Sequence, residues 1–368
     1  MGFEVKAAVL EQFGAPLVIR DIDLAPTAAG EVRVKVAAVG VCHSDINLFE
    51  GMRPTLPLPA VLGHEVSGIV AEVGAGVTRL RPGDRVVGTL APFCGHCGEC
   101  VSGRSVLCGD THVKQAPGKA RRLTLGGRHV SQLYNLSAFA EEILVHESAL
   151  VKIRDDMPLD RAALLGCAVL TGVGAVNRTA EVRPGASVAV VGCGAIGLAA
   201  INGASVAGAI RIVAVDRNPV KLELASRFGA TDFVIAGGSP EATVAEVRRL
   251  SQGGVDHAFE CVGNPTTVAQ CWKMLRPAGI ATILGVLGPQ AQVHLDGDDF
   301  LLQKQIRGSL LGSARPTVDI PYLVDLYLGG RLALDDLISR RIPLADINEA
   351  IAAIQRGEVA RSVVVFDT

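Results

Sequence analysis

The sequence predicts an α/β protein in two parts, a β-rich first part and a later part that forms a doubly wound parallel sheet. From Lys6 to Gly88, short β-branched runs alternate with Gly and Pro turn signals, which is typical of a barrel-like β domain. From Pro184 onward, apolar strands alternate with helical segments, and this alternation indicates βαβ units. The chain has 368 residues, of which 49% are hydrophobic, and this is enough for two cores.

The individual elements follow from the same patterns. In the first part, strands are expected at residues 17–19, 31–39, 66–73 and 85–87. In the second part, strands are expected at 187–191, 211–216, 233–235, 256–260 and 280–286, and helices at 195–207 and 219–228. After Gly312 the pattern is mixed, with a helix at 346–355 and a final strand at 362–366.

Charge and cysteine content narrow the class of protein. Lys+Arg 35 against Asp+Glu 37 leaves a net charge of −2, so no general attraction to nucleic acid or anionic membrane is expected. The first ten residues lack the pattern of a signal peptide, and no apolar run reaches the roughly eighteen residues that a membrane span needs. Nine cysteines without a secretion signal favour metal binding and free thiols over disulfides. We therefore expect a cytoplasmic protein with a small-molecule partner.

Four of the nine cysteines lie within fifteen residues. Their spacing is x2, x2 and x7, with glycines between them that let the backbone curl back. The four are Cys94, Cys97, Cys100 and Cys108. Four thiolates fill the tetrahedral coordination of one zinc ion and leave no open position. The cluster thus predicts a structural zinc, and the chemistry is expected elsewhere.

A glycine-rich turn begins the second part. Gly192, Gly194 and Gly197 form G-x-G-x-x-G directly after the strand 187–191, a helix is expected from Ala195, and Asp216 ends the next strand. In this context the turn predicts a dinucleotide site in which the helix N-terminus holds the pyrophosphate. An acidic residue at this position favours NAD over NADP, although Arg217 beside it leaves an NADP option. The remaining alternative is a glycine-rich turn that binds no ligand.

A second, scattered set of residues has metal-ligand chemistry. Cys42 and Cys167 both lie in glycine-containing loops, and His64 lies between them in the sequence. Two thiolates and one imidazole would leave an open fourth position on zinc, which is typical of a catalytic site. Ligands that are more than a hundred residues apart form no local pattern, so each residue also has an alternative role in the core.

Several of these segments together resemble a known family. The chain resembles the zinc-dependent medium-chain alcohol dehydrogenases along essentially its whole length. The resemblance rests on residues 40–45, 63–65, the four-cysteine lobe, 166–172, 190–197 with Asp216, and 361–366. The stretch 114–136 is similar to an insertion found in the branch that contains the liver-type enzymes and glutathione-dependent formaldehyde dehydrogenase.

The resemblance implies a fold and a set of site residues. It implies a GroES-like catalytic domain at 1–168 and 311–368 around a Rossmann domain at 169–310, with NAD and two zinc ions per chain. Cys42, His64 and Cys167 would hold the catalytic zinc. Glu65 would lie behind the metal, Asp45 would orient the ligand histidine, Ser44 would take the alcohol proton, and His43 would contact the coenzyme pyrophosphate. The implied coenzyme contacts are Gly192, Gly194, Ala195, Ile196, Gly197, Asp216, Arg217, Lys221, His43, Val286 and Arg361.

The sequence departs from the liver-type pattern at two places. Asn47 stands where liver-type members have a histidine that completes the proton relay, and asparagine does not titrate. The residues that match the substrate pocket wall carry no cation for an anionic substrate, which favours hydrophobic primary or secondary alcohols. These residues are Leu90, Leu133, Tyr134, Leu136 and Val286.

Other reactive-looking residues are expected to have ordinary roles. The basic run 119–122 is expected on a solvated loop, His96 is expected to be exposed, and the remaining cysteines are expected to be unligated. These cysteines are Cys193, Cys261 and Cys271.

Three alternatives to a freely exchanging dehydrogenase stay open. The first is a nicotinoprotein whose tightly bound NAD is reoxidised by an external acceptor, and the second is a zinc- and nucleotide-binding relative without turnover. The third is a nucleic-acid-binding zinc module, which the balanced charge disfavours. A homodimer through the sheet edge near residues 300–309 is expected, with a tetramer as the alternative.

Overall fold

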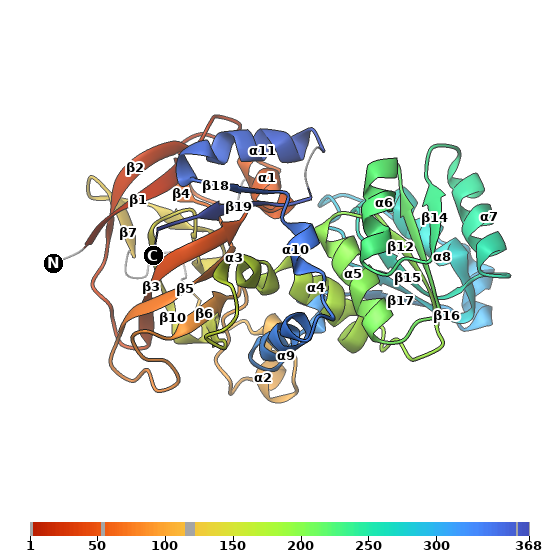
Figure 1. The fold of residues 1–368 in the computed structure, drawn as a ribbon, viewed down its shortest axis with the longest axis horizontal. Coiled ribbons are helices and arrows are strands. Elements are labelled where there is room, and N and C mark those ends of the chain that lie inside the picture. Colours follow the sequence, from red (N-terminus) through yellow and green to blue (C-terminus); the bar gives the residue numbers. More distant parts are fainter. Residues whose placement is uncertain (1–2, 53–55, 115–121, 358–359, 368) are drawn as a thin grey trace. The chain divides into compact units, whose positions relative to one another are not determined.

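The computed structural model describes residues 3–52, 56–114, 122–357 and 360–367, and it divides the chain into two compact units (Figure 1). The first unit comprises Met1–Cys167, Arg315–Leu328 and Leu337–Thr368, and the second comprises Ala168–Ala314 and Gly329–Asp336. The functional domain boundaries that we expected after residues 168 and 310 stay predictions. The segment 329–336, which they assign to the catalytic domain, packs with the second unit.

The first unit is β-rich, as the sequence predicts. One sheet has the strand order β8-β7-β2-β1-β4-β9. Strands β1 and β2 form an antiparallel pair in which Phe3 lies opposite Leu24. Its strands are β1 (Phe3–Leu10), β2 (Val18–Leu24), β4 (Ala60–Val61), β7 (Leu123–Leu125), β8 (Arg128–His129) and β9 (Ser131–Gln132). The expected strand at 17–19 is therefore the start of a longer one.

The second sheet of this unit carries most of the site. Its order is β11-β6-β5-β3-β19-β18, with β10 also paired to β3. Its strands are β3 (Glu31–Gly40), β5 (Glu65–Val73), β6 (Arg85–Gly88), β10 (Glu142–His146), β11 (Leu150–Lys152), β18 (Arg340–Ile342) and β19 (Ser362–Val365). The C-terminal strand β19 runs antiparallel to β3, with Val363 opposite Gly40. This pairing places the end of the chain beside the residues that follow β3.

Helices and short turns complete the first unit. Helix α11 (Ile347–Gln355) buries Ile347, Ile351 and Ile354, which are spaced by four and three residues and so share one helix face. The other α-helices are α1 (His43–Phe49), α2 (Gly98–Val101), α3 (Leu159–Ala162) and α9 (Pro316–Leu328). The division between the units falls within α10 (Leu334–Leu337), after Asp336. The 3-10 turns are η1 (Ser105–Leu107), η2 (Leu133–Asn135), η3 (Glu147–Ala149), η4 (Ala163–Gly166) and η8 (Leu344–Asp346).

The second unit is a parallel sheet in the order β14-β13-β12-β15-β16-β17. Its strands are β12 (Ser187–Val191), β13 (Arg211–Asp216), β14 (Asp232–Ile235), β15 (Val255–Glu260), β16 (Leu275–Ile283) and β17 (Gln305–Gly308). The chain proceeds outward from β12 on one side and returns through β15 on the other. This reversal is the switch point at which open α/β sheets bind ligands, and it confirms the predicted Rossmann architecture.

The helices of the second unit have strong sequence signals at their starts. Helices α6 (Pro219–Arg227), α7 (Pro240–Leu250) and α8 (Pro265–Met274) each begin with proline after an N-cap whose side chain accepts a backbone hydrogen bond. The N-cap residues are Asn218, Ser239 and Asn264. The remaining segments are α4 (Ala168–Gly174), a π-helix (Ala175–Thr179), α5 (Ala195–Val206), and the 3-10 turns η6 (Gly297–Leu302) and η7 (Leu311–Ser313).

One predicted strand is wrong in its bounds. The strand expected at 280–286 begins at Leu275 and ends at Ile283. Its end is set by Glu260, whose carbonyl oxygen accepts the N–H groups of both Leu284 and Gly285, at 2.9 and 3.0 Å. Two donors on one carbonyl end the regular ladder, and the chain turns there.

A cavity of about 660 Å³ lies at the opposite edge of this sheet, where the strands begin. Arg183, Asp256, His257, Arg276 and Arg307 are among its lining residues. Because open parallel sheets bind ligands at the carboxyl ends of their strands, this cavity is not the expected dinucleotide site.

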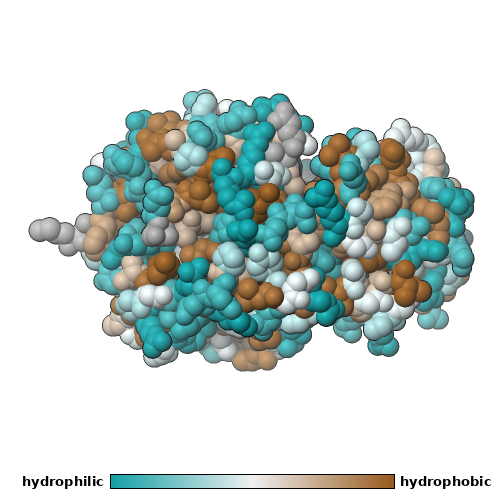
Figure 2. All heavy atoms as spheres, in the orientation of Figure 1, coloured by the Kyte–Doolittle hydropathy of each residue, from teal (hydrophilic) through white to brown (hydrophobic). Residues whose placement is uncertain are grey.

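On the surface, hydrophilic side chains cover much of the visible face of the molecule, with smaller hydrophobic areas among them (Figure 2). Among the described residues, no single helix has the length and apolar composition of a membrane span. Two helices at 159–166 and 168–179, with a bend between them, have together the length and apolar composition of a span, and only these two properties support one.

Candidate active site

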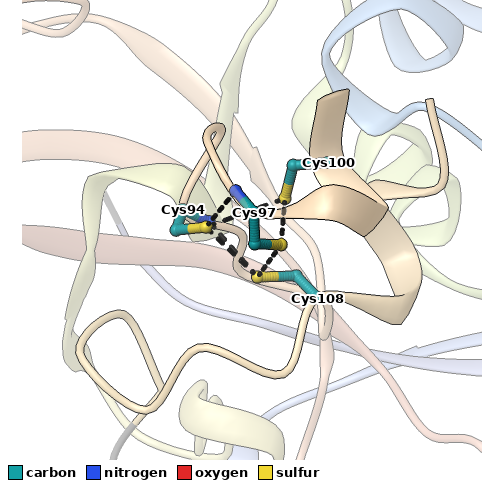
Figure 3. A group of neighbouring side chains, drawn as sticks. All are labelled: Cys94, Cys97, Cys100 and Cys108. Atoms are coloured by element: carbon teal, nitrogen blue, oxygen red, sulfur yellow. Dashed lines mark hydrogen bonds between the residues drawn. The ribbon is translucent and has the colours of Figure 1, made fainter. Parts of the chain in front are cut away.

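The four clustered cysteines form a compact cage at the start of helix α2 (Figure 3). Four of their Sγ–Sγ distances are 3.5, 3.7, 3.9 and 3.9 Å. Four thiolates at about 2.3 Å from a tetrahedral zinc would be about 3.8 Å apart, so the cage fits the ion. The backbone N–H groups of Cys94 and Cys97 each donate to a cage sulfur at 3.4 Å, which favours thiolates.

The chemistry of the cage also calls for a cation. Burial is the main effect that raises the pKa of Cys100 to about 12, and the neighbouring thiols act in the same direction. Thiolates this close repel one another unless a metal compensates their charge. His96 is exposed, as predicted, and its Nδ1 contacts the carbonyl oxygen of Cys94 at 3.0 Å. The four sulfurs therefore suffice to coordinate one ion, and His96 is not needed as a ligand.

A second cluster gathers residues that are far apart in the sequence. One ligand atom from each of Cys42, His64, Glu65 and Cys167 lies within 4.8 Å of the others, and all four residues are buried. Cys42 is the N-cap of α1, His64 and Glu65 come at the start of β5, and Cys167 follows η4. The structure thus brings together the three predicted zinc ligands and Glu65, the carboxylate that was predicted to lie behind the metal.

Asp45 fixes the geometry of this cluster from the first turn of α1. Its carboxylate accepts the backbone N–H groups of Cys42 and Gly63, both at 3.0 Å, and contacts Nδ1 of His64 at 3.0 Å. Asp45 and His64 are fully buried. Burial opposes protonation of His64, but the Asp45 carboxylate raises its pKa well above the ordinary value. In the neutral ring, the contact with Asp45 holds the proton on Nδ1, and this leaves Nε2 available as a ligand atom.

Nε2 of His64 provides the test of whether the cluster fits a metal. This atom is buried and has no hydrogen-bond partner among the described residues. Buried polar atoms are nearly always satisfied, so an unpaired imidazole nitrogen facing two thiols indicates a missing ligand. The donor set of two sulfurs and one nitrogen matches zinc.

The two thiols of the cluster interact directly. The hydrogen bond with Cys167 lowers the pKa of Cys42 well below its ordinary value, although burial opposes this effect. The same hydrogen bond, together with burial, raises the pKa of Cys167. The pair therefore holds one thiolate readily, and a cation at the site would stabilise the second.

Two glycines permit the close approach of the ligand loops. A Cβ on Gly166 would lie 2.1 Å from the carbonyl oxygen of Gly88, and one on Gly63 would lie 2.7 Å from the backbone nitrogen of Phe139. Gly63 also has a φ of 91°, a conformation that favours glycine. Larger residues would push the His64 and Cys167 loops away from the cluster.

Arg361 lies behind the cluster in a buried ion pair. Its Nη2 donates to Glu65 at 2.9 Å and its Nη1 donates to the carbonyl oxygen of Val41 at 2.9 Å. Burial raises the pKa of Glu65 to about 8, although Arg361 acts in the opposite direction. No local pattern in the sequence predicts this ion pair, because it depends on the pairing of β19 with β3. The predicted contact of Arg361 with the pyrophosphate stays a prediction.

The remaining catalytic candidates lie on α1. Ser44 is half-buried and is not the helix cap, since Cys42 takes that position. His43 is exposed, and Asn47 is half-buried one turn further along the helix. Both Ser44 and His43 therefore follow the ligand Cys42 directly, on the first turn of one short helix.

The expected pocket wall is in part a hydrophobic core. Leu133 and Leu136 are buried in the core of the first unit, and Leu90 and Tyr134 pack against it. The ring of Tyr134 lies edge-on to the ring of His64, with a centroid distance of 5.4 Å. Tyr134 therefore lies directly at the cluster. Val286 lies in the second unit.

The interpretation of the basic run 119–122 is wrong for its last residue. Arg122 is buried and pairs with Glu31 at 2.6 Å, so its side chain is not solvated. The other residues of the run lie outside the described part of the chain. So does part of the insertion at 114–136.

The glycine-rich turn has the local geometry that its sequence predicts. A Cβ on Gly197 would lie 1.8 Å from the carbonyl oxygen of Gly192, so helix α5 packs directly on the turn. Nothing lies within 4 Å of the corresponding position on Gly194, which leaves the backbone there open to a ligand. Ala195 and Ile196 form the first turn of α5, directly after this open position.

Asp216 is tied to the turn at the carboxyl end of β13. Its two carboxylate oxygens accept the N–H groups of Cys193 and Asn218, at 2.8 and 2.9 Å. Arg217 is exposed and Lys221 is half-buried on the following helix. Burial and Asp216 raise the pKa of Cys193 to about 12, so this thiol is unreactive.

Comparisons with known proteins cover nearly the whole chain. The alcohol dehydrogenase GroES-like domain matches residues 28–155, and the zinc-binding dehydrogenase domain matches residues 195–328. Alcohol dehydrogenase class-3 of Myxine glutinosa is 39% identical over 97% of this chain and 96% of its own length.

Two solved structures are similar along their full length. One is an alcohol dehydrogenase zinc-binding domain protein from Burkholderia ambifaria, with a TM-score of 0.95 and 34% identity over 100% of both chains. The other is the benzyl alcohol dehydrogenase of Acinetobacter calcoaceticus, with a TM-score of 0.92 and 33% identity over 99% of this chain and 100% of that one.

Proposed function

The chain belongs to the zinc-dependent medium-chain alcohol dehydrogenase family, and from this premise we propose that Cys42, His64 and Cys167 hold its catalytic zinc. The protein is a zinc-containing, NAD-dependent oxidoreductase that interconverts an alcohol and its aldehyde or ketone. We assign the structural zinc to Cys94, Cys97, Cys100 and Cys108. This assignment agrees with their sulfur spacing.

One observation carries the catalytic assignment. The ligand atoms of the second cluster lie within 4.8 Å of one another, and Nε2 of His64 among them is buried without a hydrogen-bond partner in the described chain. Three protein ligands leave a coordination position for substrate, whereas the four-cysteine cage leaves none. Glu65, which is paired with Arg361, would lie beside the ion behind these three ligands.

The protein's own residues divide the work of the reaction. Zinc, when bound, acidifies the alcohol hydroxyl, and NAD, when bound, accepts the hydride. Ser44 takes the hydroxyl proton at its Oγ. Since Asn47 cannot accept the proton, we assign the next step to His43, which is exposed on the same helix, or to water. Asp45 keeps the His64 ring in one tautomer throughout.

The second unit binds the coenzyme in this proposal. The open backbone at Gly194 and the first turn of α5 hold the pyrophosphate, and Asp216 accepts hydrogen bonds from the adenosine ribose. The Asp216 carboxylate would repel a 2′-phosphate, which favours NAD. Arg217, Lys221, Val286 and Arg361 are assigned as further coenzyme contacts.

For the substrate, we favour hydrophobic, including aromatic, primary or secondary alcohols. Tyr134 lies edge-on to His64, and the rest of the wall set consists of Leu and Val. The similarity to a benzyl alcohol dehydrogenase supports an apolar substrate. No cation of the wall set is available for an anionic conjugate.

Oligomeric state and location are proposals of the same kind. Strand β17 is the edge of the parallel sheet, and Leu301 and Leu310 beside it are 84% and 52% exposed. An edge strand with exposed leucines on both sides suits pairing with a second copy, so we propose a homodimer. We also propose the cytoplasm as the location, since free thiols persist in a reducing compartment.

A substrate panel tests the proposed function. Purified protein with zinc is assayed for NADH formation with benzyl alcohol, a linear aliphatic series, a secondary alcohol and an anionic thiol adduct of formaldehyde. We expect the highest kcat/KM for an apolar alcohol and NAD. The absence of turnover with every alcohol and aldehyde, in protein that holds two zinc ions per chain, would overturn the proposal.

A further inference from the structure

Glu260 is a buried carboxylate that the proposed mechanism does not use. It ends β15 at the switch point of the parallel sheet and is fully buried. Its Oε1 accepts the backbone N–H groups of Val262 and Gly263, at 3.0 and 2.8 Å, and the hydroxyl of Thr267 at 2.6 Å. Three donors on one oxygen hold the loop after β15 in a single conformation.

The same residue also ties down the neighbouring loop. Its carbonyl oxygen accepts the N–H groups of Leu284 and Gly285, which begin the loop after β16. A Cβ on Gly285 would lie 2.0 Å from the nitrogen of Gly263 and 2.5 Å from Oε2 of Glu260. The two loops therefore lie backbone to backbone, with the carboxylate directly beneath them.

These loops present two valines to solvent. Val262 is 54% exposed and Val286 is 52% exposed, and a Cβ on Gly263 would lie 2.5 Å from the carbonyl oxygen of Val286. A Cβ on Gly192 would lie 2.7 Å from Cγ2 of Val262. Val262 thus stands over the first glycine of the dinucleotide turn. An apolar surface at this point suits the face of a planar ring.

The burial of the Glu260 carboxylate has a cost in folding free energy. Oε2 of Glu260 is buried and has no hydrogen-bond partner among the described residues. A buried carboxylate with one unpaired oxygen destabilises the folded state unless its other contacts compensate. Apart from the hydroxyl of Thr267 on α8, its contacts go to the two loops that carry the exposed valines, so the carboxylate and the position of the valines are coupled.

We propose that Glu260 is a positioning residue for the coenzyme, whose carboxylate holds Val262 and Val286 as an apolar wall of the dinucleotide site. This inference rests on the proposed coenzyme site at the glycine-rich turn. Glu260 acts through the two loops and does not touch the coenzyme.

The test compares two substitutions, at Glu260 and at its hydrogen-bond donor Thr267, with a control at the other end of β15. Glu260→Gln keeps the size of the side chain but places an NH2 group beside Gly263 and Gly285, where backbone crowds it. Thr267→Val removes one of the three donors. The control is Asp256→Asn at the opposite end of the strand, where the carboxylate accepts hydrogen bonds from Ser187 and Arg276.

NADH affinity, measured by fluorescence titration, is the main readout. For Glu260→Gln we expect the Kd for NADH and the KM for NAD to rise about tenfold, which is the effect of about 1.4 kcal/mol. The zinc content should stay at the wild-type value. Thr267→Val should raise the Kd roughly threefold in the same direction. Asp256→Asn should leave the Kd unchanged even if Tm falls.

Two results would overturn the inference. If Glu260→Gln lowers Tm but binds NADH as tightly as the wild type, the carboxylate only stabilises the fold. If Glu260→Gln does not fold, an unchanged Kd in Thr267→Val has the same meaning. The proposed function fails in a different way, because the wild-type protein itself would then bind no NADH.

Discussion

The four-cysteine cage and the scattered cluster around His64 both bring together soft metal ligands, but they differ in how the chain builds them. The cage takes its ligands from one stretch of fifteen residues, and its sulfurs fill a tetrahedron. The scattered cluster takes its ligands from the N-cap of α1, the start of β5 and the end of η4. The comparison teaches that the closed site is local in sequence, whereas the open site depends on tertiary structure.

The same difference predicts the consequences of removing a ligand from each. Loss of a cage ligand should affect the stability of its lobe, and loss of a scattered ligand should affect turnover. Four changes test this separation, from the largest expected effect to the smallest.

Cys42→Ser should cause the largest loss of activity. Removal of a thiolate ligand weakens the metal and its polarisation of the substrate, which contributes several kcal/mol, so we expect kcat/KM to fall about 1,000-fold or more. The rate of NADH formation with an apolar alcohol measures this change in kcat/KM. The matched control is Cys271→Ser, a buried thiol outside both clusters. A Cys42→Ser enzyme within tenfold of the wild type would remove Cys42 from the metal site.

Cys100→Ser should act on stability. Without the fourth thiolate the cage no longer closes around its ion, and we expect Tm to fall by roughly 10 °C. Thermal unfolding followed by circular dichroism measures the change. Turnover per folded molecule at a temperature well below Tm should stay near the wild-type value. A loss of turnover without a loss of stability would reverse the roles of the two sites.

Ser44→Ala should lower kcat because the alcohol proton then lacks its first acceptor. We expect a decrease of about 100-fold, the usual contribution of a positioned proton-transfer group. Ser44→Thr keeps a hydroxyl and is the control, with a smaller decrease expected. Equal rates in Ser44→Ala and the wild type, at every pH tested, would show that the proton leaves by another route.

Asp45→Asn should weaken metal binding at the scattered cluster alone. The substitution replaces a carboxylate that holds Cys42, Gly63 and His64, and such partners of ligand residues typically affect metal affinity 10- to 100-fold, so we expect about tenfold. Competition with a chelator measures the affinity. Glu99→Gln, in an exposed ion pair with Arg104 beside the cage, should leave both affinities unchanged. A loss of the cage zinc in Asp45→Asn would contradict the independence of the two sites.

Much of the second unit can be predicted from the sequence. The strands at 187–191 and 211–216 are confirmed at both ends, because central parallel strands are buried on both faces and form continuous apolar runs. The end of β16 was predicted wrongly, since it depends on the Glu260 carbonyl oxygen rather than on a local turn signal. Glu260 carries the same kind of signal as Asp216, an acidic residue at the end of a strand, and this signal could have identified it.

The candidate site is harder to predict from the sequence. Its ligand residues meet because β3 pairs with β5 and because Gly166 permits backbone contact with Gly88. Neither contact leaves a trace in residue spacing. Arg122 shows the converse problem, because a local basic pattern did not reveal its buried partner Glu31. The resemblance to a family supplied the ligand set that spacing alone left open.

The central claim is that one metal site is closed and structural and that the other is open and catalytic. Zinc content per chain, measured by mass spectrometry for the wild type, Cys42→Ser and Cys100→Ser together with their turnover, tests it most directly. We predict two, one and one zinc ions per chain, in that order, with turnover retained in folded Cys100→Ser and lost in Cys42→Ser. Two zinc ions and full turnover in Cys42→Ser would contradict the account.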